Sequence, residues 1–323
     1  MKKNILGIMA LFAVVFLFTA LKNDSFLNAY NLQNLIKWSC LYGLIGLGVS
    51  FVIITGGIDL SIGSVIGLVA SLLALLLSKG RDPSTCIALV LALSAGIGLM
   101  HGLLITKVKL QPFVVTLCGL LFYRGIARYI TDNQSMGFSG HDTLDSIFSG
   151  KVAVSSQFAL PAPFFYLVVV AVVAALFLNR TVWGRYLFAL GNNETAARYS
   201  GIDTDSLKIL AYVACSLLTG LAGVLFAFEL NSVQPASTGE FYELYAIAAA
   251  VLGGCSLRGG EGSVLGVIIA AAVIRLLYNS INMLGISTHL EYAIIGAVIL
   301  AGVTVDELVK RYAAARRTRQ QAE

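Results

Sequence analysis

Apolar residues in this chain gather into ten long runs that are separated by short polar segments. The runs cover residues 5–21, 40–55, 61–78, 86–105, 111–130, 163–178, 208–229, 243–256, 263–283 and 289–305. Each is near the roughly 20 residues that a helix needs to cross the hydrocarbon core of a bilayer. Backbone amides in hydrocarbon must be hydrogen-bonded internally, so we expect helices, with the shorter ones broken or packed inside protein. The pattern predicts an all-α membrane protein of about ten transmembrane helices, some broken, in a single polytopic domain over 1–323.

The basic residues predict the orientation of these helices. With both termini placed in the cytoplasm, most lysines and arginines of the short loops fall on the inner side, as the positive-inside rule requires. The inner set includes Lys107, Lys109, Arg180, Arg185, Arg198, Lys208, Arg258 and a basic tail over 306–323, while the outer set is mainly Lys22, Lys37, Lys79, Arg81 and Lys151. We therefore expect a multi-pass protein of the bacterial inner membrane with both termini in the cytoplasm.

Composition excludes a soluble protein. The chain has 323 residues, of which 58% are hydrophobic and only 12% are charged, and its mean hydropathy is +0.84. Soluble domains carry about 25% charged residues. The net charge of +5 comes from residues beside the ends of apolar runs rather than from a basic stripe with interleaved aromatics, so it predicts membrane topology and not nucleic-acid binding.

The sequence offers no pattern for catalysis or metal binding. Five cysteines and three histidines are scattered singly, without the paired spacing of metal sites or an HExxH motif. Neither a GxxxxGK[ST] phosphate loop nor a GxSxG elbow is present, so we expect no catalytic residue, no metal and no cofactor in this chain. If ATP drives its function, another subunit binds the ATP.

Two connections between the apolar runs are much longer than the others. One covers 131–162 on the predicted outer side, and the other covers 179–207 on the cytoplasmic side. Long ordered loops usually carry function, which makes both of them candidates for contact with other proteins.

The cytoplasmic loop contains the signals of one short helix. Asn192 or Asn193 can cap its start, Glu194 suits its positive end, Arg198 lies near its negative end, and Gly201 can terminate it. A helix of two turns is only marginally stable alone in water, so we expect another surface to pack against it. The alternative is an ordinary connector that rests on lipid headgroups.

A second candidate is the segment Thr55–Gly63, with the sequence TGGIDLSIG, which interrupts two apolar runs. Three glycines, a carboxylate and two hydroxyls exceed what a plain helical hairpin needs, and they predict a broken helix that lines a cavity. A carboxylate at membrane depth marks a functional position, so Asp59 is the main candidate. The alternative is that Asp59 only caps a helix at the cytoplasmic interface.

The remaining polar residues of the apolar runs have ordinary interpretations. Arg124, Arg128 and Arg275 are expected to extend toward headgroups, and Glu229 to be hydrated near the outer surface. A glycine-rich segment over 252–266 is expected on the cytoplasmic side, with its charged side chains solvated.

Four motifs follow one another along the chain: Thr55–Gly63, Pro112–Leu117 with Arg124-Gly125, Gly191–Ile202 and Gly253–Ser263. In this order they resemble the motifs of one known family, the permease subunits of ribose, galactose and xylose type ABC importers. The resemblance extends over nearly the whole chain. Two departures are Leu110-Gln111, where the family usually has Ile-Pro, and the lack of Leu-Pro after Ile202.

The resemblance implies a subunit that moves a monosaccharide or related small polar solute and is not itself an enzyme. Its partners would be a cytoplasmic ATPase that binds the ATP, a periplasmic or surface sugar-binding protein facing 131–162, a second permease chain, identical or not, and membrane lipid. The segment that resembles the ATPase-coupling helix comprises Asn192, Asn193, Glu194, Ala196, Ala197, Arg198, Gly201 and Ile202. Candidate residues of the translocation pathway are Thr55, Gly56, Gly57, Asp59, Ser61, Gly63, Phe113 and Thr116.

Three mechanisms follow from these features. In the first, closure of the ATPases moves the coupling helices, the permease pair alternates between its openings, and sugar crosses without strong binding because the spans offer few sugar-ligating side chains. The second is an ion-coupled secondary transporter that uses Asp59. The third, an intramembrane enzyme, lacks a nucleophile and base pair.

Overall fold

A computed structural model describes residues 2–138, 140, 142–155, 158–302 and 304. Helices occupy all ten predicted apolar segments within that range. Their bounds are α1 Lys2–Lys22, α2 Ala29–Ile54, α3 Ile62–Ser78, α4 Pro83–Thr106, α5 Pro112–Ile130, α7 Ala162–Arg180, α10 Thr204–Leu230, α11 Tyr242–Leu252 and α12 Val264–Met283, followed by Glu291–Gly302. The predicted basic tail, 306–323, lies outside the described residues.

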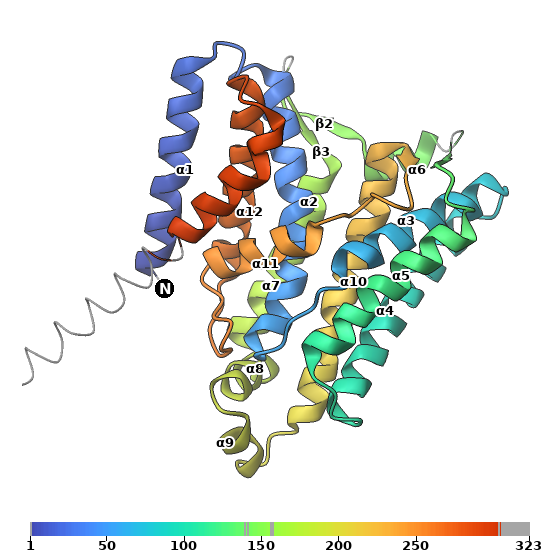
Figure 1. Cartoon of the computed structure of the whole chain (residues 1–323), viewed down its shortest axis with the longest axis vertical. Helices are drawn as coiled ribbons and strands as arrows, with labels where there is room; N and C mark the ends of the chain where they lie inside the picture. The colour runs from blue at the N-terminus through green and yellow to red at the C-terminus, as the bar shows by residue number, and fades with distance from the viewer. Residues whose placement is uncertain (1, 139, 141, 156–157, 303, 305–323) are drawn as a thin grey trace, which may run out of the picture.

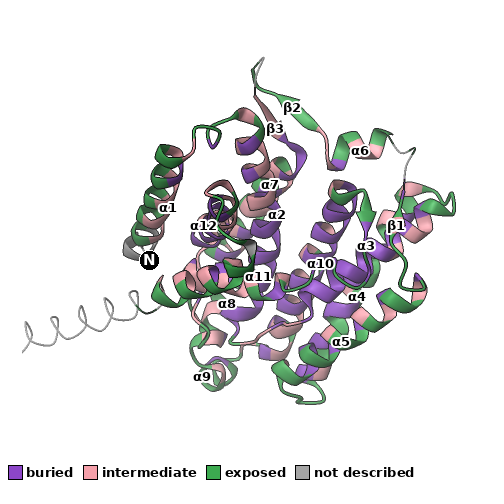
Figure 2. Cartoon of the chain, turned by 45° about the horizontal axis from the view of Figure 1, so that its top comes forward, coloured by how far each residue is buried: buried purple, intermediate pink, exposed green. Residues whose placement is uncertain are grey.

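Helices α2 and α10 form the centre of the molecule (Figures 1 and 2). Every α2 residue from Cys40 to Ile54 is buried, and so is α10 from Ala222 to Phe228. Helix α10 packs against α2, α3 and α4, while α2 also contacts α7, α11 and α12; α1 lies on α12, and α5 lies on α3 and α4. In this arrangement, the segments that interrupt the helices lie between the two central helices, α2 and α10, and the helices packed around them.

The outer helices expose apolar side chains, as lipid contact requires. On α7, for example, Val169, Val172, Val173 and Leu176 are each more than half exposed. Soluble monomers rarely expose continuous apolar surface on this scale. Together with the helical content, this surface establishes an all-α membrane protein.

The helices differ in whether they could cross a bilayer alone. Six are long and apolar enough among the described residues, namely α2, α4, α5, α7, α10 and α12. The apolar parts of α1, α3, α11 and the Glu291–Gly302 helix are shorter. Helix α11, with 11 residues, is only about 16 Å long at 1.5 Å per residue, about half of a hydrocarbon core. Ten complete crossings therefore stay a prediction.

The two long connections lie at opposite ends of the molecule (Figure 1). The loop over 131–162 holds α6 (Asp142–Phe148) and the antiparallel pair β2 (Lys151–Ala153) and β3 (Ala159–Pro161). Its strand β1 (Met136–Gly137) pairs with β4 (Ser232–Val233), with Met136 opposite Val233. The other connection folds into α8 (Val182–Asn192) and α9 (Glu194–Tyr199). In both connections, described residues thus form helices or strands.

Candidate functional site

The segment between α2 and α3 is unwound, as the sequence predicts. Asp59 is only 2% exposed, and its Oδ1 accepts hydrogen bonds from the backbone N–H (2.8 Å) and the hydroxyl (2.7 Å) of Ser61. Ser61 is the N-cap residue of α3 but caps it with no side-chain bond. Thr55 closes α2 by donating to the Val52 carbonyl at 2.7 Å. Asp59 is therefore buried, and Ser61 rather than Asp59 is the N-cap residue of α3; a functional role for Asp59 stays a prediction.

Two helices on either side hold the carbonyl of Ile58, the residue before Asp59. The Tyr212 hydroxyl on α10 donates to it at 3.2 Å, and the Thr116 hydroxyl on α5, whose shorter bond of 2.9 Å is to the Pro112 carbonyl, lies 3.4 Å from it. A Cβ on Gly57 would lie 2.7 Å from the Tyr212 hydroxyl, so glycine is needed for this approach. The structure thus brings Thr116 to the break, whereas Phe113, one turn earlier, exposes half of its side chain.

Further polar side chains surround the Asp59 carboxylate. His101, Tyr123 and Cys215 are close enough to interact with it electrostatically. The Nε2 of His101 lies 2.8 Å from the Tyr123 hydroxyl, and its Nδ1 is buried without a hydrogen-bond partner among the described residues. No three His, Cys, Asp or Glu side chains of the described residues are grouped as metal ligands. The sequence did not reveal this cluster, because its members come from three different helices.

At the inner end of α2, three glycine-rich motifs meet through their backbones. Gly260 donates its N–H to the carbonyl of Ile54 at 2.9 Å. A Cβ on Gly191 would lie 1.9 Å from that carbonyl oxygen and 2.3 Å from the Gly260 nitrogen. A Cβ on Gly259 would lie 3.0 Å from the nitrogen of Gly56. We call this contact the glycine junction; it leaves no room for side chains and joins the first break to the connection that holds α8 and α9.

The short helix α9 begins as predicted. Asn193 is its N-cap residue, and its side chain accepts a hydrogen bond from the Ala196 N–H at 2.9 Å. Of the two predicted caps, Asn192 has another role, because its side chain donates to the carbonyls of Phe188 (2.9 Å) and Gly260 (3.4 Å). Asn192 therefore ties the start of α9 to the glycine junction.

The end of α9 is a Schellman motif. Gly201 has φ +82° and donates its N–H to the Arg198 carbonyl at 3.0 Å, while Ile202 donates to the Ala197 carbonyl at 3.1 Å. These are the two bonds that define the motif, and the left-handed residue is normally glycine. Ile202 then packs against a buried apolar cluster, so the predicted terminator is confirmed in position and conformation.

Ion pairs hold α9 to the start of α10. Glu194 pairs with Arg198 at 3.4 Å and with Lys208 at 2.7 Å, and Arg198 also pairs with Asp205 at 3.1 Å. Single surface pairs contribute little, about 0–1 kcal/mol, but several charges in one network do better than isolated pairs. The network fixes the direction of α9, which its own six residues could not do.

The connection between α4 and α5 joins the same network. Lys107 and Lys109 lie 3.0 Å and 3.6 Å from Asp205. Beside them Asp203 caps α10 by accepting from the Ser206 N–H at 3.1 Å. The Ser206 hydroxyl and N–H hold the pKa of Asp203 below its ordinary value, so this carboxylate stays charged at neutral pH. The connection between α4 and α5 and the connection that holds α9 therefore form one surface.

One face of α9 is free of contacts with the membrane part. Ala197 is buried, whereas Thr195, Ala196 and Tyr199 are exposed, and Tyr199 exposes 89% of its surface. Beside it is a recess of about 370 Å³ lined by Lys109, Glu194, Thr195, Arg198 and Tyr199. An exposed aromatic ring on a fixed helix is suited to protein contact. Sequence reasoning missed Tyr199, since only the direction of its side chain distinguishes it.

The chain contains a second unwound segment, over 231–241, between α10 and α11. Arg124 of α5 donates to the carbonyls of Thr238 (2.6 Å), Pro235 (3.0 Å) and Gly63 (3.3 Å). Pro235, Thr238 and Gly63 are buried, and buried backbone carbonyls need such donors because an unsatisfied one costs free energy. The expectation that Arg124 extends toward headgroups is therefore wrong: it binds the backbone of both breaks.

The two breaks touch each other at Gly63. A Cβ on Gly63 would lie 2.1 Å from the Gly239 carbonyl oxygen and 2.2 Å from Oε2 of Glu243. Gly239 has φ +79°, a conformation that favours glycine. Glu243, which is 8% exposed, faces the N-terminal backbone of α3. The beginnings of α3 and α11 thus share one buried contact.

The other charged residues are placed as follows. Glu229 pairs with Lys37, and its side chain is 12% exposed, so the expectation of a hydrated carboxylate is wrong. Arg128 is exposed and donates to Asn133 at 3.1 Å. Arg258 and Glu261 are exposed, as predicted for solvated side chains.

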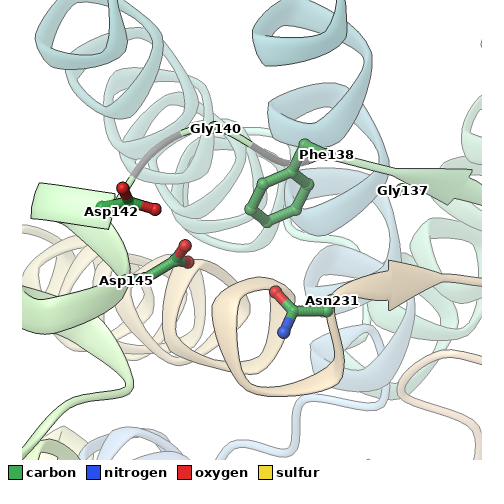
Figure 3. A pocket seen from close by; sticks show the side chains of 6 residues that line it. All are labelled: Gly137, Phe138, Gly140, Asp142, Asp145 and Asn231. Carbon is green, nitrogen blue, oxygen red and sulfur yellow. The ribbon is translucent and has the colours of Figure 1, made fainter.

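A recess of about 510 Å³ opens at the end of the molecule that carries the 131–162 loop (Figure 3). Its lining residues are Gly137, Phe138, Gly140, Asp142, Asp145 and Asn231. The two carboxylates extend from α6 toward it, with Asn231 at the end of α10 opposite them. The end opposite α9 thus carries an acidic recess.

Broken membrane helices and a small, firmly held helix at one end together define a transport permease. The family model "Branched-chain amino acid transport system / permease component" matches residues 31–303, and the chain belongs to this family. Among solved structures, no significant match exists.

Characterised relatives carry the names of sugar permeases. The chain is 38% identical over 298 residues to the ribose import permease protein RbsC of Bacillus subtilis (strain 168), covering 92% of this chain and 91% of the relative. It is 34% identical to RbsC of Escherichia coli (strain K12), covering 94% and 93%. The D-allose transport system permease protein AlsC of the same strain is 32% identical, covering 92% and 90%. The resemblance to sugar-importer permeases is thereby confirmed.

Proposed function

We propose that this chain is the membrane permease subunit of an ATP-driven importer that carries a monosaccharide into a bacterial cell. The names of its relatives support the sugar class, and residues of all four motifs lie at or beside the two breaks or in α9. ATP is bound by a partner subunit, and the permease itself performs no chemical reaction. The chain crosses the inner membrane about ten times with both termini in the cytoplasm.

The observation that carries this proposal is the glycine junction. Helix α9 docks on a cytoplasmic ATPase through Thr195, Ala196 and Tyr199, which are exposed. Because Asn192 and Gly191 contact Gly260 directly, a displacement of α9 reaches the inner end of α2. The first break then moves relative to α5 and α10, which changes the access to the pathway.

The opposite end receives the other partner. A sugar-binding protein delivers its cargo at the 131–162 loop, where the acidic recess with Asp142 and Asp145 can accept basic side chains of that protein. A second permease chain encloses the pathway together with this one. Thr55, Gly56, Gly57, Asp59, Ser61, Gly63, Phe113 and Thr116 remain the candidate pathway residues.

The test is a substitution on the exposed face of α9. Gly201→Trp is unsuitable because φ +82° strains any side chain there. Ala196→Trp adds bulk to an exposed helical position without such strain. We expect the tagged variant to lose the copurifying ATPase activity and ATP-driven sugar uptake, while its melting temperature in detergent stays unchanged.

Ala153→Trp is the matched control, since Ala153 is also exposed but lies in β2 at the opposite end. This control should retain the ATPase. Normal ATPase recovery and normal uptake with Ala196→Trp would exclude α9 as the coupling helix.

A further inference from the structure

Helix α12 carries a polar stripe on one side of an otherwise apolar helix. Arg275, Tyr278, Asn279 and Asn282 follow the i, i+3, i+4, i+7 spacing of a single face. Arg275 lies 11 residues beyond Val264, or about 16 Å along the helix, which is near the middle of a core about 30 Å thick. An arginine at this depth is costly and indicates a functional position.

Aromatic rings surround the Arg275 guanidinium. Its central carbon lies 4.3 Å from the ring centre of Tyr278, 4.9 Å from that of Tyr42 and 5.3 Å from that of Trp38. The Tyr242 ring is 5.0 Å from Tyr42, which extends the cluster onto α11. Cation–π contacts of this kind are worth about 0.5–2 kcal/mol each, enough to fix the guanidinium in place.

The guanidinium nevertheless has no hydrogen-bond acceptor among the described residues. Its Nε is buried and unpartnered, whereas Arg124 donates to three backbone carbonyls and Arg128 donates to Asn133. A guanidinium has five N–H donors, and leaving them unused at membrane depth is expensive. The two terminal nitrogens of Arg275, which are not among the buried unpartnered atoms, are therefore available to a molecule that is not part of this chain.

The chemistry around Arg275 selects a neutral polyol. Trp38, Tyr242, Tyr245 and Tyr278 are only partly buried, so ring faces are accessible for the C–H faces of a sugar. Ring faces carry partial negative charge, which disfavours an anion. Glu291, close enough to interact with Arg275, lowers the net charge and adds an acceptor for hydroxyl groups. The hydroxyl groups of a polyol both donate and accept hydrogen bonds. The arginine, the tyrosine hydroxyls and the carboxylate can together satisfy both requirements.

We infer that Arg275, with Trp38, Tyr42, Tyr242 and Tyr278, forms a weak sugar-binding station in the middle of the membrane. The inference rests on the proposed function and names the place where the transported sugar contacts the permease. It replaces the expectation that the spans offer few sugar-ligating side chains, because the station is built mainly from aromatic faces.

The chain provides a direct probe, because Trp38 is one of only two tryptophans. Trp183→Phe leaves Trp38 as the single tryptophan, whose emission is excited selectively over that of the tyrosines. As the matched control, Trp38→Phe leaves Trp183, which is 54% exposed on α8. Each variant is titrated in lipid nanodiscs with D-ribose, D-allose and L-arabinose, with potassium phosphate as the anionic probe. We expect a saturable change of the Trp38 emission at millimolar sugar, none with phosphate, and none from Trp183.

Arg275→Lys separates sugar binding from a purely structural role. Lysine keeps the charge and the cation–π contact but loses the planar fork of donors. We expect the Trp38 response to disappear and sugar uptake by the assembled importer to fall about tenfold, equivalent to about 1.4 kcal/mol, with ATPase recovery unchanged.

If the emission of Trp38 in the Trp183→Phe chain does not change with sugar, the station is overturned, whatever Arg275→Lys shows. The proposed importer function would be unaffected by that result. A response to phosphate but not to sugar would overturn it as well. Absence of ATP-driven sugar uptake by the unaltered importer would instead count against the proposed function. The Trp38 titration needs no Arg275 variant, so misfolding of Arg275→Lys does not affect it.

Discussion

The two breaks of the membrane helices satisfy their unwound backbone in different ways. The first, between α2 and α3, uses its own side chains, with Asp59 accepting from Ser61, and takes hydroxyl donors from α5 and α10. In the second, over 231–241, turn hydrogen bonds within the segment and the pairing of β4 with β1 satisfy part of the backbone, whereas the carbonyls of Pro235 and Thr238 depend on one distant guanidinium, that of Arg124. The first break should therefore tolerate single substitutions, whereas the second should loosen when the Arg124 side chain is removed.

The largest effect is expected at Gly63, where the two breaks touch. Alanine there would place a Cβ 2.1 Å from the Gly239 carbonyl oxygen, a backbone atom that cannot move away cheaply. We expect a loss of about 3 kcal/mol or more of stability from overpacking, seen as a much lower melting temperature and poor recovery in detergent.

Gly125→Ala on α5 is the control for Gly63→Ala, because nothing lies within 4 Å of a Cβ at Gly125. It should be neutral or slightly stabilising. Equal behaviour of the two variants would show that the breaks do not touch.

The next effect in size is expected for Arg124→Gln. The variant leaves carbonyls of buried Pro235 and Thr238 without a donor, and each unsatisfied group costs about 1–3 kcal/mol. Limited proteolysis at the 231–241 segment, together with the melting temperature, would report the loss. Arg128→Gln, one turn further along α5 and exposed, should change neither measurement; equal proteolysis of both variants would contradict the role of Arg124.

A smaller effect is expected for Asp59→Asn in the first break. The amide oxygen of asparagine can still accept from Ser61, so the change in stability should stay below about 1 kcal/mol. ATP-driven uptake should persist. Loss of uptake in a well-assembled complex, with transport following a proton or sodium gradient, would favour the ion-coupled mechanism instead.

The smallest effect is expected for Tyr212→Phe, which removes one donor from the Ile58 carbonyl. In the variant, the Thr116 hydroxyl can turn from the Pro112 carbonyl, which it bonds at 2.9 Å, to the Ile58 oxygen at 3.4 Å, so the loss should be about 0.5–1.5 kcal/mol. Thr116→Val with Tyr212→Phe should cost more than the sum of the single changes, because the carbonyl then has neither donor. Simple additivity of the melting temperatures would argue against a shared acceptor.

The sequence revealed the first break and not the second for a physical reason. Glycines and Asp59 stand out in an apolar run, since both are costly there. Asn231, Pro235 and Gly239 look like an ordinary surface turn, and the feature that Arg124 recognises is a set of carbonyl groups that every residue possesses. An arginine bound to backbone and an arginine near headgroups have the same sequence signature.

Helix α9 was predictable because its determinants are local. The Asn193 cap, the i,i+4 pair of Glu194 with Arg198, and Gly201 all act within ten residues. The glycine junction was not predictable, because Gly191, Gly259 and Gly56 belong to distant segments whose closeness only the fold determines. Hydropathy likewise located the helices but could not show which of them cross the membrane fully.

The junction at the inner end of α2 also gives that helix the properties of a lever. With 26 residues, α2 is about 39 Å long, and a tilt of about 5° around its middle would shift each end by about 1.7 Å. At the glycine junction, the inner end of α2 contacts the backbone of glycines. Backbone has no side-chain rotamers that could change to absorb such a shift. A small displacement of α9 would therefore arrive undiminished at the outer arm, so gating of this permease needs stiffness in one helix rather than large movements of many.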